Sequence, residues 1–150
     1  AMTVDEWDTA IGVNLSASFY LAQAALEPML AQGGGRIVFI GSISATMGVA
    51  AQAGYCAAKA GLNGLSRSLA RSVARKGITV NVVVPGVYET DMTNSMSEKA
   101  QEVVRSLIPV GRRGKPEELA GPALLFCSEA GSYITGATLI VDGGTLCRTF

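Results

Sequence analysis

Apolar residues in the first part of the chain recur every three or four positions, which is the spacing of one helix face. They are Trp7, Ile11, Leu15, Phe19, Ala22 and Leu26. Thr3 followed by Glu6 has the pattern of a capping box, so a helix is predicted over residues 5–31. Pro28 is expected to kink or restart this helix near its end, and the glycines at 33–35 are expected to stop it.

Three short apolar runs bounded by turn residues predict buried strands at 36–40, 78–84 and 137–141. The pattern between them predicts loops at 42–52 and 87–96 and helices at 53–76, 97–106 and 116–128, the last one opened by a proline. Strands that alternate with helices and are apolar throughout indicate an α/β fold, with a parallel sheet covered on both faces. No repeat or linker divides residues 1–150, so a single domain is predicted.

Composition narrows the function classes. With 49% hydrophobic and 16% charged residues, part of the surface is expected to serve for contact. The formal net charge is +0 and no basic run occurs, which argues against a nucleic-acid partner. No apolar run approaches the roughly 18 residues of a membrane span. Three cysteines without a CxxC motif, and no signal peptide, favour a cytoplasmic setting. The absence of histidine excludes a Ser-His-Asp triad and a His-ligated metal, and no metal site is predicted.

The strongest candidate chemistry is the pair Tyr55 and Lys59, four residues apart in the stretch "GYCAAKAGL". On the predicted helix 53–76 the two side chains share one face. A phenol alone is a poor base at neutral pH, and a nearby ammonium favours the phenolate. Such a tyrosine can exchange a proton with an alcohol or carbonyl oxygen. A tyrosine and a lysine at this spacing also occur on ordinary helix surfaces, so the pair alone leaves both interpretations open.

Further motifs surround the pair in a fixed order. Ser42 ends "RIVFIGS" thirteen residues before Tyr55, Asn14 lies in "IGVNLSASF", and "PGVYET" occupies 85–90. "GRRGKPEELA" and "SYITGATLIVDGG" follow. With these motifs essentially the whole chain resembles the classical short-chain dehydrogenases/reductases, in their ketoacyl-reductase-like and sugar-dehydrogenase-like branch. The resemblance implies that the strands are the last three of a doubly wound, Rossmann-like parallel sheet with flanking helices.

The resemblance also implies an NAD- or NADP-dependent oxidoreductase that interconverts a ketone and a secondary alcohol. Tyr55 would exchange a proton with the substrate oxygen, and Ser42 would donate a hydrogen bond to the same oxygen. Lys59 would support the tyrosine and bind the nicotinamide ribose. Asn14 would anchor a water that connects Lys59 with solvent. The small carbonyl or alcohol substrate would lie between Ser42, Tyr55 and the loop 88–105, whose sequence does not name it.

The segment after the second strand would hold the nicotinamide carboxamide through Pro85, Gly86, the backbone of Tyr88, and Thr90. Tyr88 departs from the aliphatic residue that family members often carry there. Structural alternatives stay open for three of the site residues. Asn14 can bond the backbone within a kinked helix, Ser42 can close a strand-end turn, and Thr90 can cap a helix.

The family's glycine-rich TGxxxGxG turn and its NNAG segment do not occur in the 150 residues. Three interpretations follow: the carboxy-terminal part of a longer dehydrogenase, a short protein that uses the Ser-Tyr-Lys site without a dinucleotide, or an inactive interaction module that keeps the association helices. The chain alone is expected to bind NAD(H) and NADP(H) weakly or not at all. Strand 36–40 is expected at an exposed edge that needs a partner, either the missing amino-terminal half or another copy.

Association is the last expectation from the resemblance. Helices 5–31 and 53–76 resemble the helices that pair as a four-helix bundle in the family, and residues 137–150 resemble its second interface. The helix 53–76 is rich in small residues that allow close approach: Ala57, Ala58, Ala60, Gly61 and Gly64. A homodimer or homotetramer is therefore predicted.

Overall fold

The computed structural model describes residues 2–147 of the chain. Its strands are β1 (Gly35–Ile40), β2 (Ile78–Pro85) and β3 (Thr138–Val141). Its α-helices are α1 (Val4–Ile11), α2 (Ala17–Ala31), α3 (Ser44–Met47), α4 (Ala53–Val73), α5 (Asp91–Asn94), α6 (Glu98–Leu107) and α7 (Ala120–Cys127). A π-helix at Gly12–Ser16 joins α1 to α2, and short 3-10 turns lie at Ala74–Lys76, Pro116–Leu119, Glu129–Gly131 and Thr145–Cys147.

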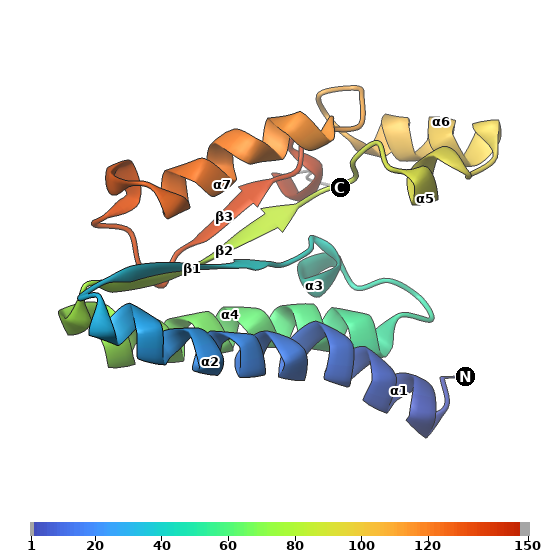
Figure 1. Cartoon of the computed structure of the whole chain (residues 1–150). Helices are drawn as coiled ribbons and strands as arrows, with labels where there is room; N and C mark the ends of the chain where they lie inside the picture. The colour runs from blue at the N-terminus through green and yellow to red at the C-terminus, as the bar shows by residue number, and fades with distance from the viewer. Residues whose placement is uncertain (1, 148–150) are drawn as a thin grey trace.

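The three strands form one parallel sheet in the order β1-β2-β3. Gly35 pairs with Ile78 at the start of the β1–β2 ladder, and Pro85 pairs with Val141 at the end of the β2–β3 ladder. Figure 1 shows α2 and α4 on one face of the sheet and α7 on the other. Every residue of β2 except its terminal proline is buried, as expected of a central strand covered on both faces. The predicted α/β architecture is confirmed, and it matches part of a Rossmann-like fold.

The amino-terminal helices follow the sequence prediction in most respects. The capping box is present, because the amide of Glu6 donates to Thr3 Oγ1 (3.2 Å) and the amide of Thr3 donates to the Glu6 carboxylate (2.7 Å). Of the kink or restart expected at Pro28, the restart is wrong, since α2 continues through this residue to Ala31. The helix is irregular earlier, at the π-turn Gly12–Ser16, which the apolar spacing does not reveal.

The core lies between α4 and the sheet. Ala58, Leu62, Ala70 and Val73 form the buried face of α4, and the cluster that contains most of them includes Ile37, Phe39, Val80 and Val82 from β1 and β2. The buried side chain of Asn81 in β2 is bonded to backbone. Asn81 donates to the Ile134 carbonyl (2.8 Å) and accepts from the Ala137 amide (3.0 Å), which fixes the chain entering β3. The second and third strands are thereby held in register beneath the site.

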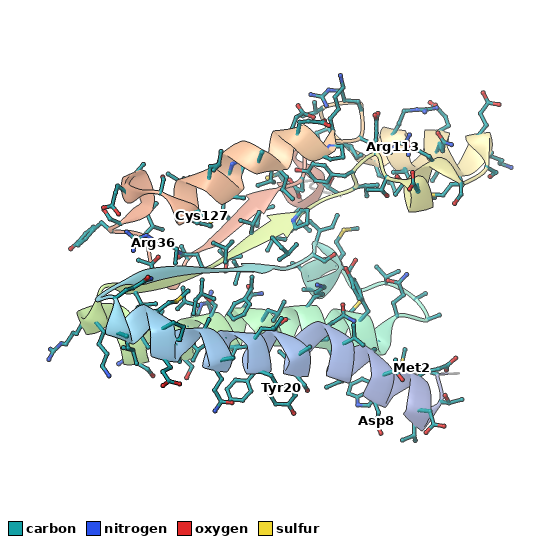
Figure 2. The ribbon with its side chains drawn as sticks, in the orientation of Figure 1. Met2, Asp8, Tyr20, Arg36, Arg113 and Cys127 are labelled. Carbon is teal, nitrogen blue, oxygen red and sulfur yellow. The ribbon has the colours of Figure 1, made fainter. Side chains whose placement is uncertain are left out.

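Two regions remain open. Within residues 2–147 no strand pairs with the outer edge of β1, where Ile40 is 45% exposed, as the sequence led us to expect. On α2 and the π-turn, Val13, Tyr20 and Leu21 are exposed, and Figure 2 shows Tyr20 pointing away from the sheet. The loops predicted at 42–52 and 87–96 contain the short helices α3 and α5. Among residues 2–147, no helix has both the length and the apolarity needed to cross a bilayer.

Candidate active site

Tyr55 lies in the first turn of α4 and Lys59 in the second, in a helix favoured here by its run of alanines. Lys59 Nζ is 5.6 Å from the centroid of the Tyr55 ring, so the ammonium faces the aromatic ring. The same nitrogen donates a hydrogen bond to the carbonyl of Ile40 at 3.0 Å. Partial burial lowers the pKa of Lys59 from its usual 10.5. The structure therefore holds the lysine between the tyrosine and the carboxyl end of β1.

Ser42 lies just beyond that strand end. The amide of Gly41 donates to Val83 (2.8 Å) and that of Ile43 donates to Pro85 (3.2 Å), so β1 remains pinned to β2 on both sides of the serine. Ser42 Oγ accepts from the amide of Ser44 (3.2 Å) at the start of α3. The strand-end turn considered from sequence is therefore present. A hydroxyl that accepts one bond still has its proton to donate, so this turn is compatible with a second role.

Asn14 occupies the middle of the π-turn Gly12–Ser16. Its amide Nδ2 donates to the Ala10 carbonyl at 3.0 Å, and Ser18 Oγ donates to the Asn14 carbonyl at 3.4 Å. The side chain thus bonds the backbone within an irregular helix, which was the structural alternative. Single π-turns inside α-helices are frequent at functional sites, so the location of Asn14 is also compatible with a functional role.

A cavity of about 750 Å³ lies beyond the carboxyl end of β2. It is lined by Ser44, Gln52, Tyr55, Pro85, Gly86, Val87, Tyr88, Thr90, Thr93, Pro116 and Leu119. The fold thus brings Tyr55 together with all four residues predicted to hold the carboxamide. Ser42, Lys59 and Asn14 do not line this cavity, and Lys59 is connected to it through the Tyr55 ring. In open α/β sheets, ligands bind beyond the carboxyl ends of the strands, where this cavity lies.

Tyr88 and Thr90 are both engaged by the protein. Thr90 is the N-cap of α5, as the structural alternative required, and its hydroxyl accepts from the Thr93 amide at 3.4 Å. Thr93 Oγ1 donates to the Tyr88 carbonyl at 2.6 Å. The Tyr88 hydroxyl donates to Val141 at 3.0 Å, and burial, with smaller contributions from the carboxylates of Glu118 and Asp142, raises its pKa. Tyr88, which replaces the aliphatic residue expected at this position, therefore links the loop after β2 to β3.

Sequence reasoning missed several cavity residues, namely Ser44, Gln52, Thr93, Pro116 and Leu119. Thr93 was recognisable, because it follows Thr90 at the spacing of a capping pair. Pro116 was identified only as a helix start. Its place in the cavity depends on the backbone bonds that the amides of Gly114 and Glu89 make across the two loops, which no local pattern reveals.

Comparisons with known proteins agree with this geometry. The sequence pattern of the protein family described as enoyl-(acyl carrier protein) reductase matches residues 1–145. The chain is 50% identical over 143 residues to the 3-oxoacyl-[acyl-carrier-protein] reductase FabG of Salmonella typhimurium, covering 95% of this chain and 59% of the relative. It is 43% identical to the 3-oxoacyl-[acyl-carrier-protein] reductase MabA of Mycobacterium bovis, covering 95% of this chain and 58% of the relative.

Solved structures give the same result. A putative 2-deoxy-d-gluconate 3-dehydrogenase from Agrobacterium tumefaciens with bound NADP is 39% identical with a TM-score of 0.93, over 98% of this chain and 61% of that one. A gluconate 5-dehydrogenase from Burkholderia cenocepacia in complex with NADP and tartrate is 32% identical with a TM-score of 0.94, over 99% and 59%. The chain thus spans about 59% of the length of the curated relatives it matches.

Proposed function

The chain belongs to the classical short-chain dehydrogenase/reductase family, and on that premise we propose that it carries the proton-transfer site of an oxidoreductase that interconverts a ketone and a secondary alcohol. The observation that carries the proposal is the position of Lys59 Nζ, 5.6 Å from the ring of a tyrosine that lines the cavity at the end of β2. A bare surface pair would have neither the cavity nor the bond from Lys59 to the strand end.

Each residue has a defined role in this proposal. In the reducing direction the Tyr55 hydroxyl gives its proton to the substrate oxygen, and in oxidation it takes that proton back. The Lys59 ammonium stabilises the phenolate that remains. Ser42 donates to the same substrate oxygen, on which negative charge develops. Asn14 anchors a water that returns protons to Lys59 from solvent.

A nicotinamide cofactor fits the residues present. The cavity has room for a nicotinamide ring and part of its ribose, and Tyr55 and Thr90 are among the residues that line it. Tyr55 and Lys59 would hold the ribose, while Pro85, Gly86, the backbone of Tyr88, and Thr90 would hold the carboxamide. When bound, the nicotinamide supplies or accepts the hydride. NADP is bound in the Agrobacterium tumefaciens relative, and NAD or NADP is proposed here.

The rest of the cofactor site and the assembly are part of the same proposal. Because the chain spans about 59% of its curated relatives, groups for the pyrophosphate and adenosine are proposed to come from an amino-terminal segment of those relatives' kind. A homodimer or homotetramer is proposed, with exposed apolar residues such as Tyr20 and Leu21 covered by another copy. The substrate is a small carbonyl compound or alcohol.

The test is a chimera in which the portion of the Salmonella typhimurium relative that this chain does not cover is placed before residue 1. Nicotinamide absorbance is followed with a panel of ketones and secondary alcohols. Tyr55→Phe keeps the ring and removes the proton, so turnover is expected to fall by at least about 100-fold. Tyr133→Phe makes the same change at a fully exposed ring and is the matched control.

Lys59→Ala is expected to lower turnover, weaken cofactor binding and move the pH dependence of turnover upward, because the phenolate loses its ammonium. If Tyr55→Phe retains most of the rate, the pair has no catalytic role. The chain would then be an association module, a second candidate that the exposed residues Val13, Tyr20 and Leu21 favour.

A further inference from the structure

The loop from β2 to α5 lies beyond the carboxyl ends of the strands (Figure 1) and borders two cavities. One is the 750 Å³ cavity that Tyr55 lines, and the other has a volume of about 170 Å³. The smaller cavity is lined by this loop together with residues within 110–118 and 141–143. Val87 and Tyr88 line both cavities, so these two residues separate them. A segment with open space on two sides has few packing contacts, and its position depends on its hydrogen bonds.

The Tyr88 side chain links this loop to the sheet. Its hydroxyl donates to the Val141 carbonyl at 3.0 Å, and the same carbonyl accepts the Gly86 amide at 3.0 Å. The loop is thus tied to β3 twice, by its backbone where it leaves β2 and by a side chain two residues later. Burial raises the pKa of the Tyr88 phenol, so the hydroxyl keeps the proton that it donates. An aliphatic side chain at this position cannot make the second bond.

Gly114 provides the surface on which the Tyr88 ring lies. A Cβ at position 114 would lie 2.7 Å from Cε1 and 2.9 Å from Cδ1 of that ring. Gly114 is not among the glycines with a positive φ, so the space taken by the ring, and not the backbone conformation, favours glycine here. The two segments are also joined by backbone, because the Gly114 amide donates to Val87 (3.0 Å) and the Glu89 amide donates to Gly114 (2.8 Å). The ring is therefore held where its hydroxyl reaches Val141.

The remaining bonds of the loop lead to segments outside the sheet. The Tyr88 carbonyl accepts from Thr93 Oγ1 of α5 at 2.6 Å, and Gly114 belongs to the loop after α6. Loss of the bond from Tyr88 to Val141 would leave these partners free to move together with the loop. A loop that is already fixed in the free protein loses less conformational freedom when a ligand binds to it. The bond to β3 is therefore expected to act on ligand affinity.

We propose that Tyr88 is a positioning residue, whose hydroxyl and ring hold the loop 86–90 against β3 in the arrangement that receives the nicotinamide carboxamide. This inference rests on the proposed function, because it concerns how the same cavity holds its cofactor. The side chain of Tyr88 acts through the backbone of its own loop. It tightens cofactor binding and has a smaller effect on proton transfer at Tyr55.

The first test measures amide hydrogen exchange by NMR in the full 150-residue chain without any ligand. The Glu89 amide is the reporter, because its bond to Gly114 opens when the loop moves. Tyr88→Phe keeps the ring and removes the donor, so exchange at Glu89 should become about 3- to 10-fold faster. The amide of Val82 within β2 is the internal reference and should exchange as in the parent chain. Tyr133→Phe, at a fully exposed ring, is the matched control and should change neither amide.

The second test uses the chimera with the reduced nicotinamide cofactor that it turns over. Tyr88→Phe should raise KM for this cofactor by about 3- to 10-fold and lower kcat by less. A residue that only supported the fold would reduce the amount of active enzyme, which lowers apparent kcat and leaves KM unchanged. Gly114→Ala should resemble Tyr88→Phe, because its Cβ displaces the ring. In a Tyr88→Ile background, which has no ring to displace, Gly114→Ala should add little.

Unchanged exchange at Glu89 in Tyr88→Phe would overturn the proposal, and so would equal acceleration at Glu89 and Val82, which would mean that the bond only supports the fold. A cofactor KM that stays unchanged while the chimera turns over would overturn this inference alone and leave the roles of Tyr55 and Lys59 intact. Conversely, a rate that survives Tyr55→Phe would contradict the proposed function. The exchange at Glu89 and the cofactor KM would still decide the role of Tyr88.

Discussion

Gly54, the residue before Tyr55, faces α1 across a gap that leaves no room for a side chain. A Cβ placed there would lie 2.9 Å from the Cβ of Ala10 and 3.4 Å from Met2 Sδ. Carbon atoms normally pack at about 3.5–4.0 Å. A Cβ at Gly64, in the same helix α4, would meet nothing within 4 Å. Gly54→Ala should therefore force α1 away from α4, while Gly64→Ala should not.

The pair of variants isolates the cost of this contact. Alanine is favoured over glycine by up to about 1 kcal/mol in a helix interior, where Gly64 lies, and by no more than that in the first turn, where Gly54 lies, so this term cancels in part in the difference. Overpacking costs roughly 1–3 kcal/mol, and in a domain of this size 1 kcal/mol shifts the melting temperature by about 2–4 °C. Gly54→Ala is therefore expected to melt roughly 2–12 °C below Gly64→Ala.

Differential scanning calorimetry at two protein concentrations measures this difference. Adding Ala10→Gly to Gly54→Ala removes the opposing Cβ and should recover much of the lost melting temperature. The recovery is measured against Ala10→Gly alone, which carries the helix-propensity cost of the new glycine. Equal melting temperatures for the two alanine variants would refute the close approach of α1 to α4 beside Tyr55. If only Gly64→Ala lowers the melting temperature, and does so more at higher protein concentration, another copy of the chain packs against the Gly64 face of α4.

Two further predictions concern charge and association. Hydrogen bonds from the Arg112 side chain and the Lys115 amide lower the pKa of Glu118 from 4.5 to about 2. Its contribution to stability is thus complete above pH 4.5 and is lost as the pH falls toward about 2. Thermal melts of Glu118→Gln should show a shallower decline across this window than the parent chain, and Glu117→Gln, at an exposed neighbour, should decline like the parent. Leu21 is 72% exposed on α2, so Leu21→Glu should raise the dissociation constant of the oligomer by at least roughly tenfold in sedimentation velocity, unlike Val103→Glu on α6. A parent chain that sediments as a folded monomer at micromolar concentration would contradict the association itself.

The sequence predicted the sheet well because its strands carry a strong local signal. The run Ile78–Val84 is rich in β-branched residues and is bounded by glycine and proline, which is typical of a central parallel strand. Helix α4 was predicted from residue 53 to 76, and the structure differs only in making its last turn, Ala74–Lys76, a 3-10 helix. Hydrophobic burial determines these elements, and burial is visible in the pattern of the residues themselves.

Features set by a few hydrogen bonds were not predictable in this way. The π-turn at Gly12–Ser16 was not predictable, because its residues resemble those of any helix. Thr90 illustrates the same limit within the site. Its type and spacing suit both a helix cap and a cofactor ligand, and the structure shows the cap while the ligand role remains a proposal.

The bond between Lys59 and Ile40 shows why a motif becomes a candidate site only within the fold. Peptide groups along a parallel strand alternate between its two edges. Since the amide of Gly41 donates to β2, the Ile40 carbonyl points away from β2, toward the outer edge of β1. Lys59 reaches that carbonyl at 3.0 Å, so its ammonium is held at the edge of the sheet that no described strand covers. The register of β1 thus decides whether the lysine is held beside Tyr55, because a shift of one residue would turn this carbonyl toward β2 and remove the acceptor.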